Sequence, residues 1–428
     1  MDTMKIRREN MVKKNIITAF LMFMMCLLVG VASSGASVFV QCPRDNIPPV
    51  SGAYDPVTNS WISADGTIVC IHLVATDGFV NMADKQTTDV PYGRIQYTFG
   101  FTNVTGLPNN TSDAILPATE LGAEFPAPTI SVKQGQDVYI TLTNRSFTIR
   151  PDLFDGHSLH WHGFPNAATV FDGEPMASFG VFPGSSFTYY YKVNDPGTYM
   201  YHCHVEATEH MQMGMLGNLY VRPLQDDNPG SCAGFAGFAY NDGDCTTGYH
   251  VSYPIQLTSF DPDFHDADMN IQPLPFAAME DRYPMINGRG YPDTINPAIL
   301  SNSYADSPSG GKPSQKMNSI ISANSGQRIL LRISSLATIR FYTLISPSIP
   351  MKVVGKDTRL LRATFGAPPP NLYYNTNSVT LGGGQSVDAI IDTTGVPAGT
   401  YYLYTSNLNE LNNDKEDFGG MMTEIRIN

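Results

Sequence analysis

Apolar and polar residues alternate along much of this chain, and the alternation predicts β-strands. It is clear in residues 93–101 and 138–144, and an aromatic run at 187–193 also has the composition of a strand. Successive side chains of a strand point to opposite faces, so we expect each segment to bury one face. Short strands at this spacing, separated by turn-forming residues, are typical of a Greek-key sandwich.

The second part of the chain repeats the pattern of the first. The octapeptide Gly-Gln-Asp-Val-Tyr-Ile-Thr-Leu at residue 135 is echoed by Gly-Gln-Arg-Ile-Leu-Leu-Arg-Ile at residue 326, and the run at 197–204 is echoed at 399–406. We therefore expect an all-β fold of two sandwiches joined by a linker. The expected segments are 93–223, 224–248 and 249–428.

The N-terminus has the features of an export signal. Basic residues precede an apolar run at 16–31, which is followed by a small-residue zone at 32–36. This arrangement predicts a signal peptide, residues 1–36, that is removed on export to the periplasm or the extracellular space. An uncleaved membrane anchor is the alternative, but the apolar run is short for one, so we expect no stable membrane insertion after cleavage.

The cysteines agree with export. Cys26 would leave with the signal, and two sequence-local pairs remain in loop-rich surroundings, Cys42 with Cys70 and Cys232 with Cys245. Such pairs predict two disulfides formed in an oxidising compartment. Residues 37–92 carry few periodic runs and many turn formers, so we expect an N-terminal extension pinned by the first disulfide.

Length and charge narrow the class of protein further. A chain of 428 residues suggests two domains. Its formal net charge of −13 argues against nucleic acid or an anionic membrane surface as a partner.

Two short segments hold six of the nine histidines of the chain. One reads His-Ser-Leu-His-Trp-His-Gly from residue 157, and the other reads Tyr-His-Cys-His from residue 201 and continues to residue 215. Together they offer a soft thiolate, imidazoles and a weak thioether, a set that suits a trigonal copper site with a distant axial methionine. The candidate ligands of this site are His157, Cys203, His210 and Met215.

Strand alternation predicts a second site behind the first. His202 and His204 should point away from the side chain of Cys203, and His160 and His162 should share one face of their strand. These four imidazoles could hold a second metal centre. The peptide links between Cys203 and its two histidine neighbours would then join the centres by a short route for electrons.

At these motifs the chain resembles two-domain multicopper oxidases built from cupredoxin domains, over roughly residues 93–428. The segment from His157 resembles the family's His-Pro-x-His-x-His-Gly motif, and His202-Cys-His204 resembles its His-Cys-His motif. The resemblance implies two cupredoxin-like domains, type 1 copper in the first site and a type 2/type 3 centre at the four remaining histidines. It also implies a small-molecule or metal-ion reductant and dioxygen as substrates.

The chain departs from the family in its histidine count. A trinuclear cluster in the family takes about eight histidines, four from each of two facing domains. Imidazole is a suitable ligand for copper. Only four are visible here, because the second sandwich has Thr405 where the first has Cys203 and carries no His-x-His pair. The others could come from a second copy across a two-fold axis, which makes a homo-oligomer the expectation, or from a different chain. Alternatively, the second centre is a lone copper or is empty.

Other candidate ligands are weaker. His265 is the plausible extra ligand in the second sandwich, although a hydrated acidic loop explains it more simply, and we expect structural roles for His72 and His250. The copper loop carries an insertion of two residues between His204 and His210, and we expect Met211 and Met213 on that loop to face solvent or a docking surface.

Three functions remain open. An oxidase would pass electrons from a reductant to dioxygen, and His160 and His204 favour it. A copper nitrite reductase would need a second-domain histidine, which only His265 could supply. A non-catalytic electron carrier would use the first site alone. Glu206 and Glu209 beside the copper loop could bind a metal-ion reductant, but solvated surface is the simpler reading.

Overall fold

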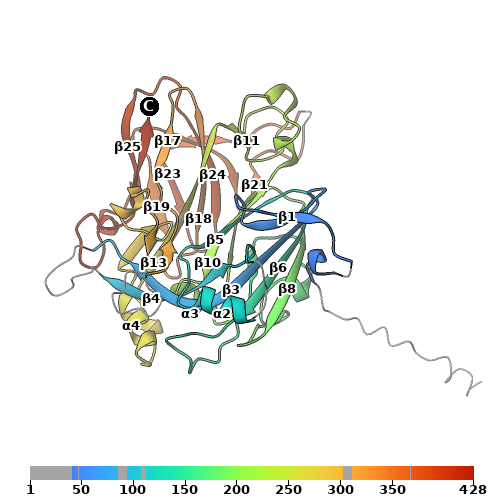
Figure 1. Cartoon of the computed structure of the whole chain (residues 1–428). Helices are drawn as coiled ribbons and strands as arrows, with labels where there is room; N and C mark the ends of the chain where they lie inside the picture. Colours follow the sequence, from blue (N-terminus) through green and yellow to red (C-terminus); the bar gives the residue numbers. More distant parts are fainter. Residues whose placement is uncertain (1–40, 47, 85–93, 108–111, 302–310, 367) are drawn as a thin grey trace, which may run out of the picture. The chain divides into compact units, whose positions relative to one another are not determined.

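Strands arranged as two β-sandwiches dominate this computed structural model (Figure 1). The structure describes residues 41–46, 48–84, 94–107, 112–301, 311–366 and 368–428. The predicted signal peptide, 1–36, lies outside these residues. Across the described ranges, the model contains no helix with the length and apolar character needed to cross a membrane.

The first sandwich packs a six-stranded sheet against a four-stranded sheet, and Phe101 and Tyr201 meet across its core with ring centroids 6.0 Å apart. The larger sheet runs β1-β2-β3-β6-β8, with β4 paired to β3, and the smaller runs β5-β10-β9-β7. The strands of the larger sheet are β1 (Gly52–Asp55), β2 (Ser60–Ser63), β3 (Ile68–Asn81), β4 (Ile95–Asn103), β6 (Asp137–Asn144) and β8 (Ser186–Lys192). Those of the smaller sheet are β5 (Ala127–Lys133), β7 (His160–His162), β9 (Gly197–His202) and β10 (Leu216–Arg222).

Strand β6 shows the expected alternation. Val138, Ile140 and Leu142 are buried in the core, and the residues between them are partly exposed. The period of two therefore predicted both the strand and its inward face.

Residues 52–81 differ from the expected extension, because they form β1, β2 and β3 of the first sandwich. β3 pairs with β2, β4 and β6, and all but its two end residues are buried. Because its inner residues are buried on both faces, including His72, Thr76 and Asp77, the strand lacks the alternation of apolar and polar residues that marks a half-buried strand. The predicted Cys42–Cys70 disulfide is confirmed, and it ties the start of the described chain to this strand.

The second sandwich repeats the strand pairing of the first. β13 is parallel to β18 as β3 is to β6, and β17 is parallel to β26 as β5 is to β10. Its larger sheet comprises β13 (Val251–Phe260), β14 (Tyr283–Ile286), β18 (Arg328–Ser335), β20 (Met351–Lys356), β21 (Arg359–Leu360), β22 (Tyr374–Thr376) and β24 (Ser386–Asp392). Its smaller sheet comprises β17 (Ile321–Ala323), β19 (Tyr342–Ile345), β23 (Ser378–Leu381), β25 (Gly399–Thr405) and β26 (Met422–Ile427). The internal repeat in the sequence is thus a repeat of topology.

Short elements complete the fold. The three described α-helices are α2 (Ser112–Thr119), α3 (Ala207–Gln212) and α4 (Pro262–Met269). Two small ladders join β11 (Gly237–Phe238) to β12 (Gly248–Tyr249) and β15 (Leu300–Ser301) to β16 (Pro313–Gln315).

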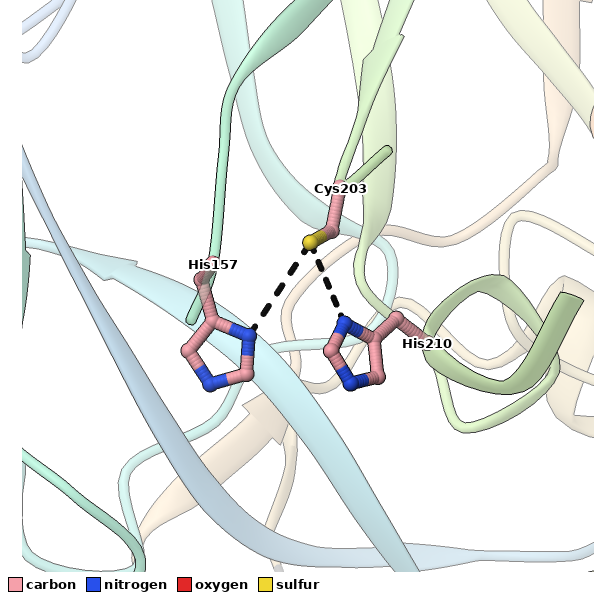
Figure 2. Close-up of side chains that lie close together, drawn as sticks. All are labelled: His157, Cys203 and His210. Atoms are coloured by element: carbon pink, nitrogen blue, oxygen red, sulfur yellow. Dashed lines mark hydrogen bonds between the residues drawn. The ribbon is translucent and has the colours of Figure 1, made fainter. Parts of the chain in front are cut away.

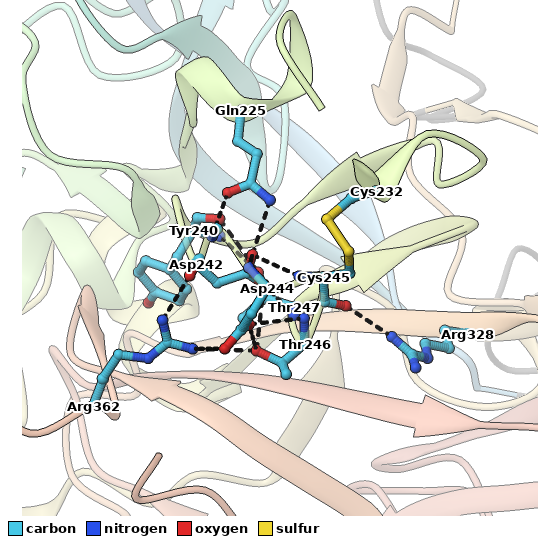
Figure 3. The surroundings of a disulfide bond; sticks show 11 residues. Gln225, Cys232, Tyr240, Asp242, Asp244, Cys245, Thr246, Thr247, Arg328 and Arg362 are labelled. Carbon is cyan, nitrogen blue, oxygen red and sulfur yellow. Dashed lines mark hydrogen bonds and ion pairs between the residues drawn. A yellow bond between two sulfur atoms is a disulfide. The ribbon is translucent and has the colours of Figure 1, made fainter. Parts of the chain in front are cut away.

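The loop before β12 is held by the second disulfide and by one aspartate. The Cys232–Cys245 bond is present as predicted (Figure 3). Beside it, Asp242 accepts hydrogen bonds from the Gln225 side chain and from the backbone N–H groups of Asp244 and Thr247. The loop between the sandwiches is therefore ordered by covalent and polar contacts, although it has few regular elements.

Asp281, which precedes β14, is a buried carboxyl whose ionisation opposes folding. Burial is the main cause that raises its pKa from 3.8 to about 6. Its Oδ1 atom has no hydrogen-bond partner. The folded state therefore holds this proton more tightly than the unfolded state does, and the associated stability is present at low pH and lost as pH rises from about 4 to about 6.

We expect Asp281→Asn to remove this pH dependence. The pKa of Asp281 differs by about two units between the folded and unfolded states, which corresponds to about 2 to 3 kcal/mol in the free energy of unfolding. The variant should therefore gain that stability relative to the parent as pH rises from about 4 to about 6. Urea unfolding at several pH values measures that difference, and the exposed Asp417→Asn is the control. A difference between Asp281→Asn and the parent that stays constant from pH 4 to pH 7 would contradict the assignment.

Candidate metal centre

The eight candidate ligands come from two neighbouring strands of the smaller sheet, from the segment just before β7, and from the connection between β9 and β10 that contains α3. β7 and β9 are antiparallel, and their register places His160 opposite His202. Trp161, which alternates with the histidines of β7, is fully buried in the core of the first sandwich. Alternation along these strands therefore directs the imidazoles to one side, as the sequence predicted.

His157, Cys203 and His210 come together as one buried group (Figure 2). The Sγ atom of Cys203 lies 3.2 Å from Nδ1 of His210 and 3.9 Å from Nδ1 of His157. The backbone N–H of Ser158 also donates to this sulfur, at 3.4 Å. Both imidazoles thus present the same ring nitrogen to a single thiol, which is a donor set that suits copper.

Met215 is tied to this group through its backbone. Its N–H donates to the carbonyl of His210 at 2.8 Å, and its own carbonyl accepts from the N–H of Cys203 at 3.0 Å. The residue is fully buried. These two bonds close the copper loop on itself, so three of the four predicted ligands are fixed relative to one another by main-chain contacts.

Burial keeps the first group electrically neutral. It lowers the pKa of His157 well below its ordinary value and that of His210 to about 4, and it raises the pKa of the Cys203 thiol to about 12. Each shift has desolvation as its main cause, since a charged form would be stranded in the core. A metal ion bound here would have to displace the thiol proton.

The other four histidines line a separate cavity of about 290 Å³. One ring nitrogen from each of His160, His162 and His202 lies within 4.8 Å of the other two. The ring of His204 lies 5.0 Å from that of His160, measured between centroids. Sequence alternation therefore predicted correctly that these four rings gather apart from the thiol.

The far wall of this cavity comes from the second sandwich of the same chain. It consists of Leu336, Ala337, Thr338, Gly383 and Gly384. None of these side chains carries an imidazole, a carboxylate or a thiol. The four imidazoles therefore face a wall without strong metal ligands.

The remaining histidines lie elsewhere. His265, in α4, is buried with its two ring nitrogens against the backbone carbonyls of Tyr97 and Gln212. His72 contacts the Thr143 hydroxyl, and His250 accepts from the N–H of Arg328. The structural roles expected for His72 and His250 agree with these contacts. His265 is neither a solvated loop residue nor a member of either histidine group.

The copper loop is more buried than its sequence suggested. Met213 has no exposed surface, and Met211 packs against an apolar cluster and lines the four-histidine cavity. The expectation that both face solvent or a docking surface was wrong. The two-residue insertion forms part of the short helix α3, which turns these side chains inward.

An acidic group lies beside the outer nitrogen of His210. Asp155, Glu206 and Glu209 each place a carboxylate oxygen within 4.8 Å of the others and of the His210 ring. Burial, together with neighbouring carboxylates, raises the pKa of Glu209 to about 8, whereas the side chain of Glu206 is 61% exposed. Sequence analysis singled out the two glutamates but not Asp155, which belongs to neither motif.

Residues 111–226 match a family model described as multicopper oxidase, and this segment contains all eight candidate ligands. Much of the first sandwich thus matches the multicopper oxidase family, and copper is the cofactor of that family. The resemblance seen in the two histidine motifs is confirmed for this part of the chain.

Particular relatives match part of the chain. Laccase-1 of Cryptococcus neoformans var. grubii is 32% identical over 149 residues, which are 33% of this chain and 22% of that protein. The L-ascorbate oxidase of Cucurbita pepo var. melopepo is 35% identical over 107 residues, which are 24% of this chain and 18% of that protein. This chain therefore spans about a fifth of the length of these curated relatives.

Solved structures share the fold of this chain over both sandwiches. The Blue Copper Oxidase from Nitrosomonas europaea has a TM-score of 0.58 and 22% identity, covering 84% of this chain and 85% of that chain. The multicopper oxidase mgLAC has a TM-score of 0.57 and 19% identity, covering 84% and 86% respectively. At this identity the likeness establishes the all-β architecture of two cupredoxin-like sandwiches.

Proposed function

We propose that this protein is an exported copper oxidoreductase that takes electrons from a reductant at a type 1 copper site and passes them to a second copper centre, where dioxygen is reduced. The observation that carries the proposal is the convergence of His157, Cys203 and His210 on one buried point. The reductant is a small molecule or a metal ion. The predicted export signal and the two disulfides support a periplasmic or extracellular location.

The donor set at the first group fits type 1 copper. One thiolate and two imidazoles from His157, Cys203 and His210, with the thioether of Met215 as a weaker fourth donor, would form the soft set that this copper prefers. Copper held there would supply one-electron redox chemistry. The chain's own contribution is a dry, preorganised pocket in which both imidazoles already present Nδ1 to the sulfur.

Covalent connection supports transfer to a second centre. Cys203 is bonded through its peptide groups to His202 and His204, whose rings line the neighbouring cavity. The route is only a few bonds long and lies in the interior, because Cys203 is fully buried and His202 is nearly so. An electron carrier with the first site alone would have no need for four imidazoles on the other side of the strand.

The nitrite reductase alternative has less support. It needs a histidine from the second sandwich, and His265 is the candidate. Both ring nitrogens of His265 are engaged with backbone carbonyls, so neither is available to the four-histidine cavity. We therefore favour dioxygen as the acceptor.

The expected result on copper loading is a blue protein that consumes oxygen. A reductant added without air should bleach the blue band, and admission of air should restore it, because electrons pass through the first site to dioxygen. Visible absorption and an oxygen electrode measure these steps with phenolic and metal-ion reductants in turn. Nitrite is the control acceptor. A band that is restored by nitrite but not by air would contradict the oxidase proposal.

A further inference from the structure

We propose that the four-histidine cavity is a single-ion copper centre, held by His160, His162 and His202 and complete within one chain. This inference rests on the proposed copper function, but it concerns the number of ions and the source of the ligands. The family resemblance implies a trinuclear cluster with about eight imidazole ligands. The residues present do not fit such a cluster.

In His160 and His202, a hydrogen bond occupies one ring nitrogen and leaves the other free to bind a metal. Nδ1 of His160 donates to the carbonyl of Asp172 at 2.6 Å, and Nδ1 of His202 donates to the carbonyl of Cys203 at 2.8 Å. Metal-binding histidines characteristically use their second nitrogen in this way, because the bond fixes the tautomer and the ring orientation. Nε2 of each ring is thereby left as the ligand atom.

The third ring is oriented by the second sandwich. Gly384 packs against the Nε2 side of the His162 ring. Nδ1 of His162 then lies 3.3 Å from Nε2 of His202. Two imidazoles bound at about 2.0–2.1 Å to one tetrahedral ion have nitrogens roughly 3.3 Å apart. The observed spacing therefore suits two ligands of the same ion.

The wall that faces the four histidines supplies no second set of imidazoles from the residues that line the cavity. A Cβ atom added to Gly384 would lie 2.7 Å from Nε2 of His162, so the backbone of the second sandwich already touches the histidine group. Leu336, Ala337 and Thr338 complete that wall. The position that a facing domain would occupy is taken by this chain's own second sandwich, and a second copy is not needed to complete the centre.

Copper counting on the full-length, copper-loaded chain tests the inference. We expect two coppers per chain, both visible by electron paramagnetic resonance and both retained when the protein is diluted to a monomer. Four coppers per functional unit, or a coupled pair that is silent in resonance, would overturn it. Loss of the second copper on dilution to monomer would also overturn it, since the ligands would then be shared between copies.

The metal count also separates this inference from the function on which it rests. A blue protein with one copper per chain overturns the single-ion centre and leaves the type 1 site intact. A chain that binds no copper overturns the proposed function itself.

Two variants address the ligands directly. His162→Ala should keep the blue band and lose the second resonance signal, with one copper per chain. Gly384→Ala should do the same, because its new Cβ would displace the His162 ring. Gly326→Ala is the matched control, since its φ of +83° is close to the +86° of Gly384 but no atom lies within 4 Å of the added Cβ. Retention of both signals in His162→Ala would overturn the assignment even if Gly384→Ala fails to fold.

Discussion

Cys203→Ser is expected to abolish the blue band and the oxidase activity together. Among the described residues, Cys203 is the only cysteine outside a disulfide, and its sulfur lies beside the imidazoles of His157 and His210. Serine would supply a hard oxygen, which suits copper of this type poorly. Removal of residues that merely support a metal ligand costs about 10- to 100-fold, so loss of the thiolate should exceed about 100-fold in turnover. Visible absorption and reductant-dependent oxygen uptake measure the two effects.

A substitution at Met213, elsewhere on the copper loop, provides the control for the Cys203→Ser experiment. Met213 lies on the same loop and is as deeply buried as Met215, but it has no assigned metal role. Met213→Leu should keep the blue band, because the hydrogen bonds of Met213 with Phe99, Thr98 and Glu209 all use its backbone, which the substitution leaves in place. Oxygen uptake that survives in Cys203→Ser would show that electrons enter elsewhere.

Asp388→Ala is expected to lower the free energy of unfolding by about 3 to 5 kcal/mol, because it strands a buried charge. Asp388 in β24 is buried and accepts hydrogen bonds from Thr198 at 2.6 Å and from Tyr240 at 2.7 Å. Its Oδ1 atom also lies 3.8 Å from a guanidinium nitrogen of Arg332, whose side chain is only 4% exposed. Thr198 belongs to β9, so this network joins the second sandwich to the strand that carries His202.

Two further variants make the stability test specific. Asp392→Ala, on the same strand, removes an aspartate whose side chain is 54% exposed and should cost less than about 1 kcal/mol. The double variant Arg332→Met with Asp388→Leu should recover much of the loss, since an apolar pair leaves no unpaired charge. Urea unfolding measures all three. Equal losses for Asp388→Ala and Asp392→Ala would contradict the role given to the buried network.

The chemistry of the first site was accessible from the sequence because its ligands are close together in the chain. Three of them fall within residues 203–215, and alternation along β7 and β9 is a local property of strands. The disulfides were accessible for the same reason, since each closes a short loop. The internal repeat could be read directly, because equivalent strands keep their glycines and their apolar pattern.

The sequence did not predict which strands are buried on both faces, and it did not predict contacts between distant segments. β3 was mistaken for part of an extension, because a strand covered on both sides lacks a clear period. Met213 was expected at the surface, and the turn of α3 places it inside. Asp155 approaches His210 from a segment that carries no motif.

The sequence by itself determined the ligand types, their division between two faces of one strand, and the loss of ligands from the second copy of the repeat. These follow from residue identity and from the two-residue period of a strand. Only the tertiary structure decided what faces the four imidazoles. The wall at Leu336–Thr338 and Gly383–Gly384 lies well over a hundred residues from the histidines in the chain, and no local pattern encodes such a contact.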